Sequence, residues 1–232
     1  MALIVRIDVD RAYGKHPAVR HVLSRLSSDY YFPKINALGY LEELKIILRL
    51  LNQNRARAYV FFRRCTLPSR ETLELLENGG HEIGLHLENS RTFESFERER
   101  RMLERHVGRR VSAFSKHGSG GAKYGRHHYG PYEPDKYLDW ARQARMKVFL
   151  GNLEDPTIRP SLEHGGLTSF PSAFWLEPHW RDTRAFTVDW LLTEAAASDI
   201  VLLIHPENVL ESADLTEQFR GLVSRLETRI FS

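Results

Sequence analysis

Six side chains of this sequence are of the types that bind metal ions or transfer protons, and each lies at the end of an apolar run. They are Asp8, Asp10, His86, Lys116, His117 and His205. Carboxylates and imidazoles are zinc ligands, and they also donate or accept protons during catalysis. If the fold brings these side chains together, the chemistry they fit is metal-assisted hydrolysis.

The elements that must position these residues alternate between two patterns. Short apolar runs typical of buried strands cover 2–7, 57–62, 81–87, 110–115, 147–150 and 199–205. Apolar residues at helical spacing cover 37–54, 69–80, 93–107, 134–145, 188–198 and 215–230. Strand followed by helix, repeated, predicts parallel strands with helical crossovers. We expect an α/β fold, a distorted (β/α) barrel of seven or eight strands, with an open doubly wound sheet as the alternative.

Composition is consistent with one domain over 1–232. Hydrophobic residues make up 42% of the chain, enough for a substantial core. The net charge is +3 without a basic stripe, so no nucleic-acid partner is expected. The N-terminus is apolar for too few residues to be a signal peptide or a membrane span, which predicts a cytoplasmic location.

Two stretches show no regular pattern. Residues 116–134 are rich in Gly, His and Tyr, and a loop of that length in a compact domain is usually functional or mobile. The second stretch, about 152–183, contains Trp175 and Trp180. These rings could stack on a sugar or simply fill the core, and the sequence leaves both interpretations open.

In a parallel barrel, ligands bind beyond the carboxyl ends of the strands, which is where the candidate residues lie. Asp8 and Asp10 are two apart, so both point to one face of a strand and require a cation or a shared proton. Alternatively, Asp8 pairs with Arg6 or Arg11 while Asp10 caps a loop. Each histidine could equally be a packed residue at a strand end.

Several stretches together resemble a known family. The chain is similar to the NodB-like polysaccharide deacetylases, or carbohydrate esterase family four, through "RIDVD", "GHEIGLH", "FSKHG" and "LLIHPEN". The first stretch is particularly similar to the branch that deformylates formamido-arabinose lipids. The resemblance covers most of the chain and implies a distorted (β/α) barrel. It also implies removal of acyl groups from sugars with one divalent metal, commonly zinc.

The resemblance also implies a role for each candidate. Asp8 would be the general base, and Asp10 and His86 would be metal ligands. His205 would be the general acid that protonates the leaving amine. Lys116 lies next to the family's arginine position, where it would orient the base.

Two positions depart from the family pattern. The second motif of the family is His-x-x-x-His, but Ser90 stands in the final place, and His117 stands where proline is usual. We hypothesise that His117 replaces the missing imidazole, so that Asp10, His86 and His117 form a two-histidine, one-carboxylate site. Glu88 is a weaker candidate for the third ligand.

These observations predict a metal-dependent hydrolase that removes an N-acetyl or N-formyl group from a sugar or sugar-linked substrate. One alternative is a metal-independent amide hydrolase of the same fold, because some relatives act on cyclic amides from purine breakdown. Another is a non-catalytic carbohydrate-binding descendant. The presence of candidates for both base and acid, Asp8 and His205, favours an enzyme.

Overall fold

The computed structural model describes residues 2–162 and 165–231. The strands are β1 (Leu3–Val9), β2 (Ala58–Phe62), β3 (Glu82–Leu87), β4 (Ala113–Lys116), β5 (Val148–Leu153), β6 (Ser161–Leu162), β7 (Thr168–Ser172), β8 (Phe174–Trp175) and β9 (Ile200–Ile204). The α-helices are α1 (Ala18–Tyr30), α2 (Glu42–Gln53), α3 (Arg70–Asn78), α4 (Phe93–Val107), α5 (Pro134–Gln143), α6 (Val188–Ala197), α7 (Pro206–Glu211) and α8 (Ala213–Arg225). Short 3₁₀ helices are η1 (Asn36–Leu38), η2 (Arg64–Thr66) and η3 (Pro178–Trp180).

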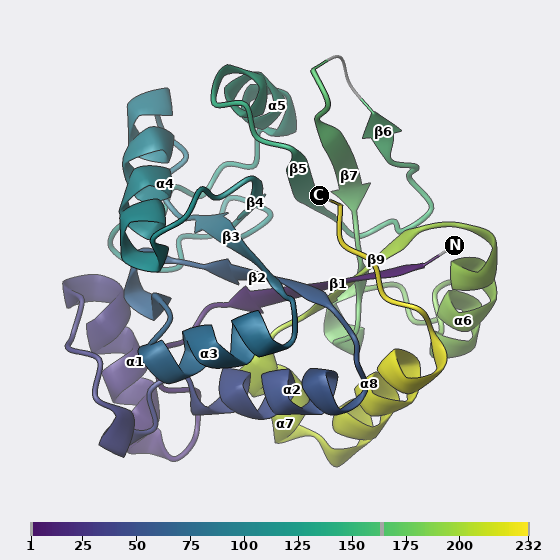
Figure 1. The fold of residues 1–232 in the computed structure, drawn as a ribbon, viewed down its shortest axis with the longest axis horizontal. Coiled ribbons are helices and arrows are strands. Elements are labelled where there is room, and N and C mark those ends of the chain that lie inside the picture. Colours follow the sequence, from purple (N-terminus) through teal and green to yellow (C-terminus); the bar gives the residue numbers. More distant parts are fainter. Residues whose placement is uncertain (1, 163–164, 232) are drawn as a thin grey trace.

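All nine strands form one sheet that curls on itself, with the order β6-β7-β5-β4-β3-β2-β1-β9-β8 (Figure 1). Every pairing is parallel except that of β6 with β7. The strands near the two ends of this order, β7 and β8, are consecutive in the chain and are separated only by Ala173. One stretch of chain therefore pairs with β5 in its first half and with β9 in its second half, which closes a distorted barrel.

The expected architecture is confirmed. With β7 and β8 counted as one continuous strand and the short β6 set aside, seven strands form the ring, as expected for a distorted (β/α) barrel. The register places Asp8 opposite Phe61 and His86 opposite Ser115, so the carboxyl ends of neighbouring strands meet at one rim.

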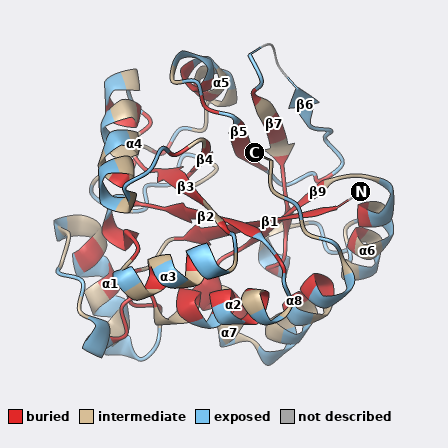
Figure 2. Ribbon diagram, in the orientation of Figure 1, coloured by how far each residue is buried: buried red, intermediate tan, exposed pale blue. Residues whose placement is uncertain are grey.

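Side-chain alternation along the strands creates two hydrophobic clusters. On β1, Val5 and Ile7 point outward into the large cluster beneath the helices, whereas Ile4 points into the barrel interior. Figure 2 shows the strands almost wholly buried, with the exposed faces of the helices on the outside. Arg6 and Asp8 lie two and four residues after Ile4 on the same strand, so their side chains also point inward, and both are buried inside the barrel.

Two expectations about local structure were wrong. The stretch 152–183 was expected to be irregular, but it contains β6, β7, β8 and η3. Its strands are short, and Pro171 interrupts the usual pattern because it has no N–H for a ladder. Helix α1 was not predicted; in the structure most of its large apolar side chains are exposed, and only Leu23 packs against the core. Within the described residues, no helix is long and apolar enough to cross a membrane.

Candidate active site

The carboxyl end of β1 supplies the two carboxylates. Asp8 is buried, and Arg6 holds both its oxygens, through Nε–Oδ1 at 2.9 Å and Nη2–Oδ2 at 2.6 Å. The remaining Arg6 N–H groups donate to the carbonyls of Leu150 and Gly151 and to Oδ1 of Asn152. All five guanidinium donors therefore have acceptors, which is the condition for burying such a charge.

The imidazole of His86 comes from β3. Its Nδ1 lies 2.7 Å from Oγ of Ser115, the residue opposite it on β4. This contact fixes the orientation of the ring and turns Nε2 toward Asp10. Nε2 lies 3.1 Å from Oδ1 of Asp10 and 3.6 Å from Oδ2 of Asp8.

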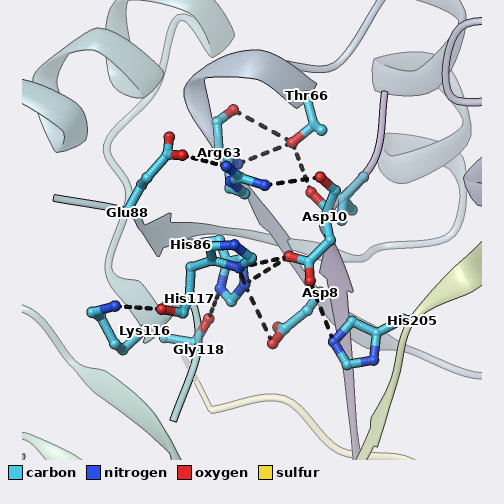
Figure 3. A network of polar contacts seen from close by, with 12 residues as sticks. Asp8, Asp10, Arg63, Thr66, His86, Glu88, Lys116, His117, Gly118 and His205 are labelled. Carbon is cyan, nitrogen blue, oxygen red and sulfur yellow. Dashed lines mark hydrogen bonds and ion pairs between the residues drawn. The ribbon is translucent and has the colours of Figure 1, made fainter. Parts of the chain in front are cut away.

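His117 completes a compact triangle of donor atoms at the rim, as Figure 3 shows. It follows β4, and its backbone N–H donates to the carbonyl of Leu87. Its Nδ1 lies 2.9 Å from Oδ1 of Asp10 and 3.2 Å from Nε2 of His86. Asp10, His86 and His117 thus form a group of three side chains whose ligand atoms all lie within 4.8 Å of one another.

The triangle fits a small divalent ion. Zinc takes nitrogen and oxygen ligands at about 2.0–2.1 Å, so neighbouring donors of a tetrahedral site lie about 3.3 Å apart. The three edges here, 2.9, 3.1 and 3.2 Å, are close to that value. Oδ1 of Asp10 is buried and makes no well-aligned hydrogen bond within the described residues, as expected of an atom that binds a cation.

Electrostatics agree with this interpretation. Burial raises the pKa of Asp10, but the adjacent His117 and His86 outweigh it and hold the pKa well below its usual range. Burial lowers the pKa of His117 well below its usual range, with a smaller contribution from Arg63. The carboxylate of Asp10 is therefore ionised, which is the state in which it can bind a cation.

His205 lies on the other side of Asp10, at the end of β9. Its Nδ1 is 2.9 Å from Oε1 of Glu177, and its Nε2 is 3.7 Å from Oδ2 of Asp10. The same oxygen of Glu177 accepts hydrogen bonds from the backbone N–H of His205 and from Asn208. Burial lowers the pKa of His205, but Glu177 and then Asp10 and Asp8 outweigh it and raise the pKa to about 10.

The expected role of Lys116 is not supported by its contacts. The side chain is buried, and its ammonium donates to the carbonyl of His117 and contacts Nε2 of His128 at 3.0 Å. Burial lowers the pKa of Lys116 to about 8. Asp8 is instead held by Arg6, which lies two residues before it on the same strand face.

The other positions that the sequence singled out are not part of the triangle. Ser90 is buried, with its hydroxyl 3.2 Å from that of Tyr137. Glu88 forms a buried ion pair with Arg63 and is not part of the triangle. His81, the first histidine of the "GHEIGLH" stretch, contacts Asn52 and the backbone N–H of Ala58 at the opposite end of the barrel, so its role there is structural.

Sequence reasoning missed Arg6 and Glu177. Arg6 was considered only as an alternative partner for Asp8. Because the two residues are two apart on one strand, their side chains were already expected on the same strand face. Glu177 lies in the stretch that was expected to be irregular, so nothing placed it beside His205. A strand prediction for "FWL", before Glu177, would have placed this carboxylate at the catalytic rim.

A cavity of about 220 Å³ opens beside the triangle. Its wall includes Asp8, Asp10, His86, His117, His205 and Asn152, together with aromatic rings. Both tryptophans left open by the sequence, Trp175 and Trp180, line it, and Trp175 is also part of the core inside the barrel. From the glycine-rich stretch 116–134, Tyr124 reaches the cavity, while His128 is buried.

Known proteins were compared with this chain at the levels of sequence and structure. No protein-family model matches it, and no curated protein does. A glycoside hydrolase/deacetylase candidate from Parabacteroides distasonis has a TM-score of 0.53 at 9% identity, over 96% of this chain and 65% of that one. A CE4 family pseudoenzyme from Bacillus anthracis has a TM-score of 0.44 at 15% identity, over 99% and 66%. A family 4 acetyl xylan esterase from Clostridium thermocellum, solved with a cobalt ion, has a TM-score of 0.39 at 12% identity, over 94% of this chain and 84% of that one.

The chain therefore has the same fold as the Parabacteroides protein. It spans slightly less than two thirds of the length of that protein and of the Bacillus protein.

Proposed function

We propose that this chain is a metal-dependent hydrolase of the polysaccharide deacetylase type. Its reaction is removal of an N-acetyl or N-formyl group from a sugar or sugar-linked substrate. The observation that carries the proposal is the Asp10–His86–His117 triangle, with Asp8 next to it and the His205–Glu177 pair beyond Asp10. Base, cation site and acid thus share one cavity wall.

A divalent ion, with zinc as first choice, would be held by Asp10, His86 and His117. When bound, it would supply Lewis-acid chemistry, polarising the acyl carbonyl and making water easier to deprotonate. Ser115 would keep His86 in the tautomer whose Nε2 is free to bind.

Asp8 is the proposed general base. It accepts a proton from the water whose oxygen attacks the acyl carbon. Arg6 orients the carboxylate through two hydrogen bonds from within the barrel, so the reactive oxygen has a fixed position at the rim. This preorganisation avoids an entropic cost at the moment of reaction.

His205 is the proposed general acid. As the C–N bond breaks, its imidazolium donates a proton to the leaving nitrogen, giving a free amine and a carboxylic acid. With a pKa of about 10, the ring is protonated at neutral pH and holds the proton that the step needs. Glu177 acts as a positioning residue, since it holds both the ring and the backbone N–H of His205.

The substrate class is proposed from the cavity. A volume of about 220 Å³ suits an acyl group with part of one sugar ring. Trp175 and Trp180 offer ring faces on which a sugar can stack, with centroids 5.8 Å apart.

One experiment tests this function. Purified protein is analysed for bound metal and then incubated with N-acetylated and N-formylated amino sugars and their oligosaccharides, while released acetate and formate are measured. We expect about one divalent ion per site, and release that stops on chelation and returns with added zinc. Release that survives thorough chelation would favour the metal-independent hydrolase instead. Sugar binding without any release would favour the binding module.

A further inference from the structure

Helix α1 has its apolar and polar faces reversed relative to a core-packing helix. Its buried residues are Ser24 and Ser27. Four of the ten large apolar side chains that are exposed in the described part of the chain lie on this single helix: Val19 (61% exposed), Val22 (55%), Leu26 (37%) and Tyr30 (68%). At 100° per residue, these four lie within an arc of about 80°. We call them the α1 stripe.

Two buried serine hydroxyls attach the other side of α1 to the protein, together with Leu23, which is partly buried and packs against the main core. Ser24 Oγ donates to the carbonyl of Gly14 and accepts from the backbone N–H of Tyr13. Ser27 Oγ donates to the carbonyl of Cys65. These bonds hold the helix in place with its apolar side turned to solvent, at the periphery of the molecule in Figure 2. The orientation of the stripe is therefore built into the fold.

Cations flank the stripe. Beside Tyr30 lies a hollow of about 420 Å³ whose charged lining residues are Arg25, Lys123 and Arg126, with Asp29 as the one carboxylate. The Arg126 guanidinium lies 5.9 Å from the centre of the Tyr30 ring. Asp29 already accepts a hydrogen bond from the backbone N–H of Arg126. The hollow thus presents a positive surplus next to an apolar stripe.

Helix α1, which carries the stripe, lies at the same end of the barrel as the candidate active site. Helix α1 follows the carboxyl end of β1, after the short loop that begins with Asp10. Arg11 lines the catalytic cavity, and its Nη1 lies 3.0 Å from Nδ1 of His21 on α1. A surface bound along α1 would therefore lie at the same end of the barrel as the cavity.

We propose that the α1 stripe and its flanking cations dock this protein on an anionic phospholipid surface, with α1 lying in the plane of the interface. An exposed apolar helix face bordered by Arg and Lys is the pattern of interfacial helices, whose apolar side enters the acyl boundary while cations meet lipid phosphates. The stripe exposes on the order of 400 Å², about half of what one partner contributes to a specific protein–protein interface. Both its size and its charge favour a bilayer over a second copy of the chain.

Vesicle cosedimentation tests the proposal without any need for turnover. The full chain is mixed with vesicles of phosphatidylcholine alone, or of three parts phosphatidylcholine to one part phosphatidylglycerol. We expect binding to the phosphatidylglycerol vesicles that weakens as salt is added, because the cations are exposed. The double substitution Val22→Glu and Leu26→Glu should weaken binding at least about tenfold. Arg126→Glu should reduce binding to phosphatidylglycerol vesicles and leave the stripe intact.

Leu162→Glu is the matched control, because Leu162 is 79% exposed and lies outside α1. It should bind like the unchanged protein, and circular dichroism should show all variants folded. Equal binding by the Val22/Leu26 variant and the control would overturn the proposal. So would a concentration-dependent dimer, seen by sedimentation without lipid, that the Val22/Leu26 variant abolishes, because the stripe would then be covered by a second copy.

Discussion

The position of one imidazole distinguishes this site from the family pattern it resembles. Ser90 occupies the sequence position of a family ligand, yet its hydroxyl contacts Tyr137 away from the triangle. His117, from the neighbouring strand end, lies 2.9 Å from Asp10 and supplies the second ring. Two imidazole nitrogens and one carboxylate therefore surround one point without any contribution from Ser90.

We expect the amount of bound metal to depend on His117 and not on Ser90. Removing one of three ligands from a site weakens binding steeply, so His117→Ala should lose most of its bound metal at equal total zinc. Ser90→Ala serves as the control and should retain it. The measurement is metal analysis after dialysis against trace zinc. Undiminished metal in His117→Ala would show that another residue completes the site.

Asp8 should be needed for turnover but not for metal binding. The side chain lies 3.6 Å from His86 Nε2 and is held by Arg6, beside the triangle and not in it. Asp8→Asn removes the proton acceptor, and a general base typically contributes about 10²–10⁴-fold to the rate. We expect kcat to fall by that range while metal content is unchanged. Retained turnover would remove Asp8 as the base.

The alkaline limit of activity should depend on Glu177. In the proposed mechanism, turnover requires the protonated ring of His205, so we expect activity below the pKa of about 10 and loss of activity as pH rises through that value. Glu177→Gln removes the main charge that favours the imidazolium, so the pKa falls. In a plot of kcat/KM against pH, the alkaline limb should shift to lower pH by at least about one pH unit. An exposed control, Glu217→Gln, should leave the limb in place, and an unmoved limb in both variants would exclude this role of Glu177.

At the scale of elements, packing accounts for the second glycine of the "GHEIGLH" motif, Gly84. A Cβ on Gly84 would lie 2.3 Å from the Phe61 ring and 3.1 Å from the carbonyl oxygen of Ala113, so β2, β3 and β4 leave it no room. Gly84→Ala should lower the free energy of unfolding by about 1–3 kcal/mol through overpacking. Gly120→Ala, where a Cβ would meet nothing within 4 Å, should be nearly neutral. The urea midpoint measures both, and equal midpoints would contradict the packing argument.

Most elements with strong periodicity could be predicted from the sequence, and those without it could not. The range of α4 was predicted to the residue, and the predicted range 69–80 contains α3 together with its N-cap Ser69, whose side chain accepts from the N–H of Thr72. Helix α1 was missed although Val19, Val22 and Leu26 recur at helical spacing, so periodicity was present there and was overlooked. The β7–β8 stretch was missed because one strand that changes partner halfway has no single pattern of burial. The position of Glu177, which follows this stretch, could not be predicted either, because a side chain can be placed only when its element is known.

At the scale of the whole molecule, the closed barrel predicts one cooperative unit over 1–232. Strands β1 and β9 lie side by side in the ring although they come from the two halves of the chain. Unfolding either half would therefore expose the core of the other. We expect a single urea transition, with coincident curves from circular dichroism and tryptophan fluorescence. Two separated transitions would mean that the chain contains more than one folding unit.

The three donors of the triangle come from the ends of β1, β3 and β4, not from one local motif. An ion bound by all three residues would link the ends of three strands reversibly, in addition to its role in the proposed reaction. A ligand that binds only the native state stabilises it by mass action, by about 2.7 kcal/mol at a hundred times its dissociation constant. The supply of metal would then determine both how long the protein persists in the cell and how fast it turns over its substrate. A starved cell would hold a pool of this chain that is both idle and more easily degraded.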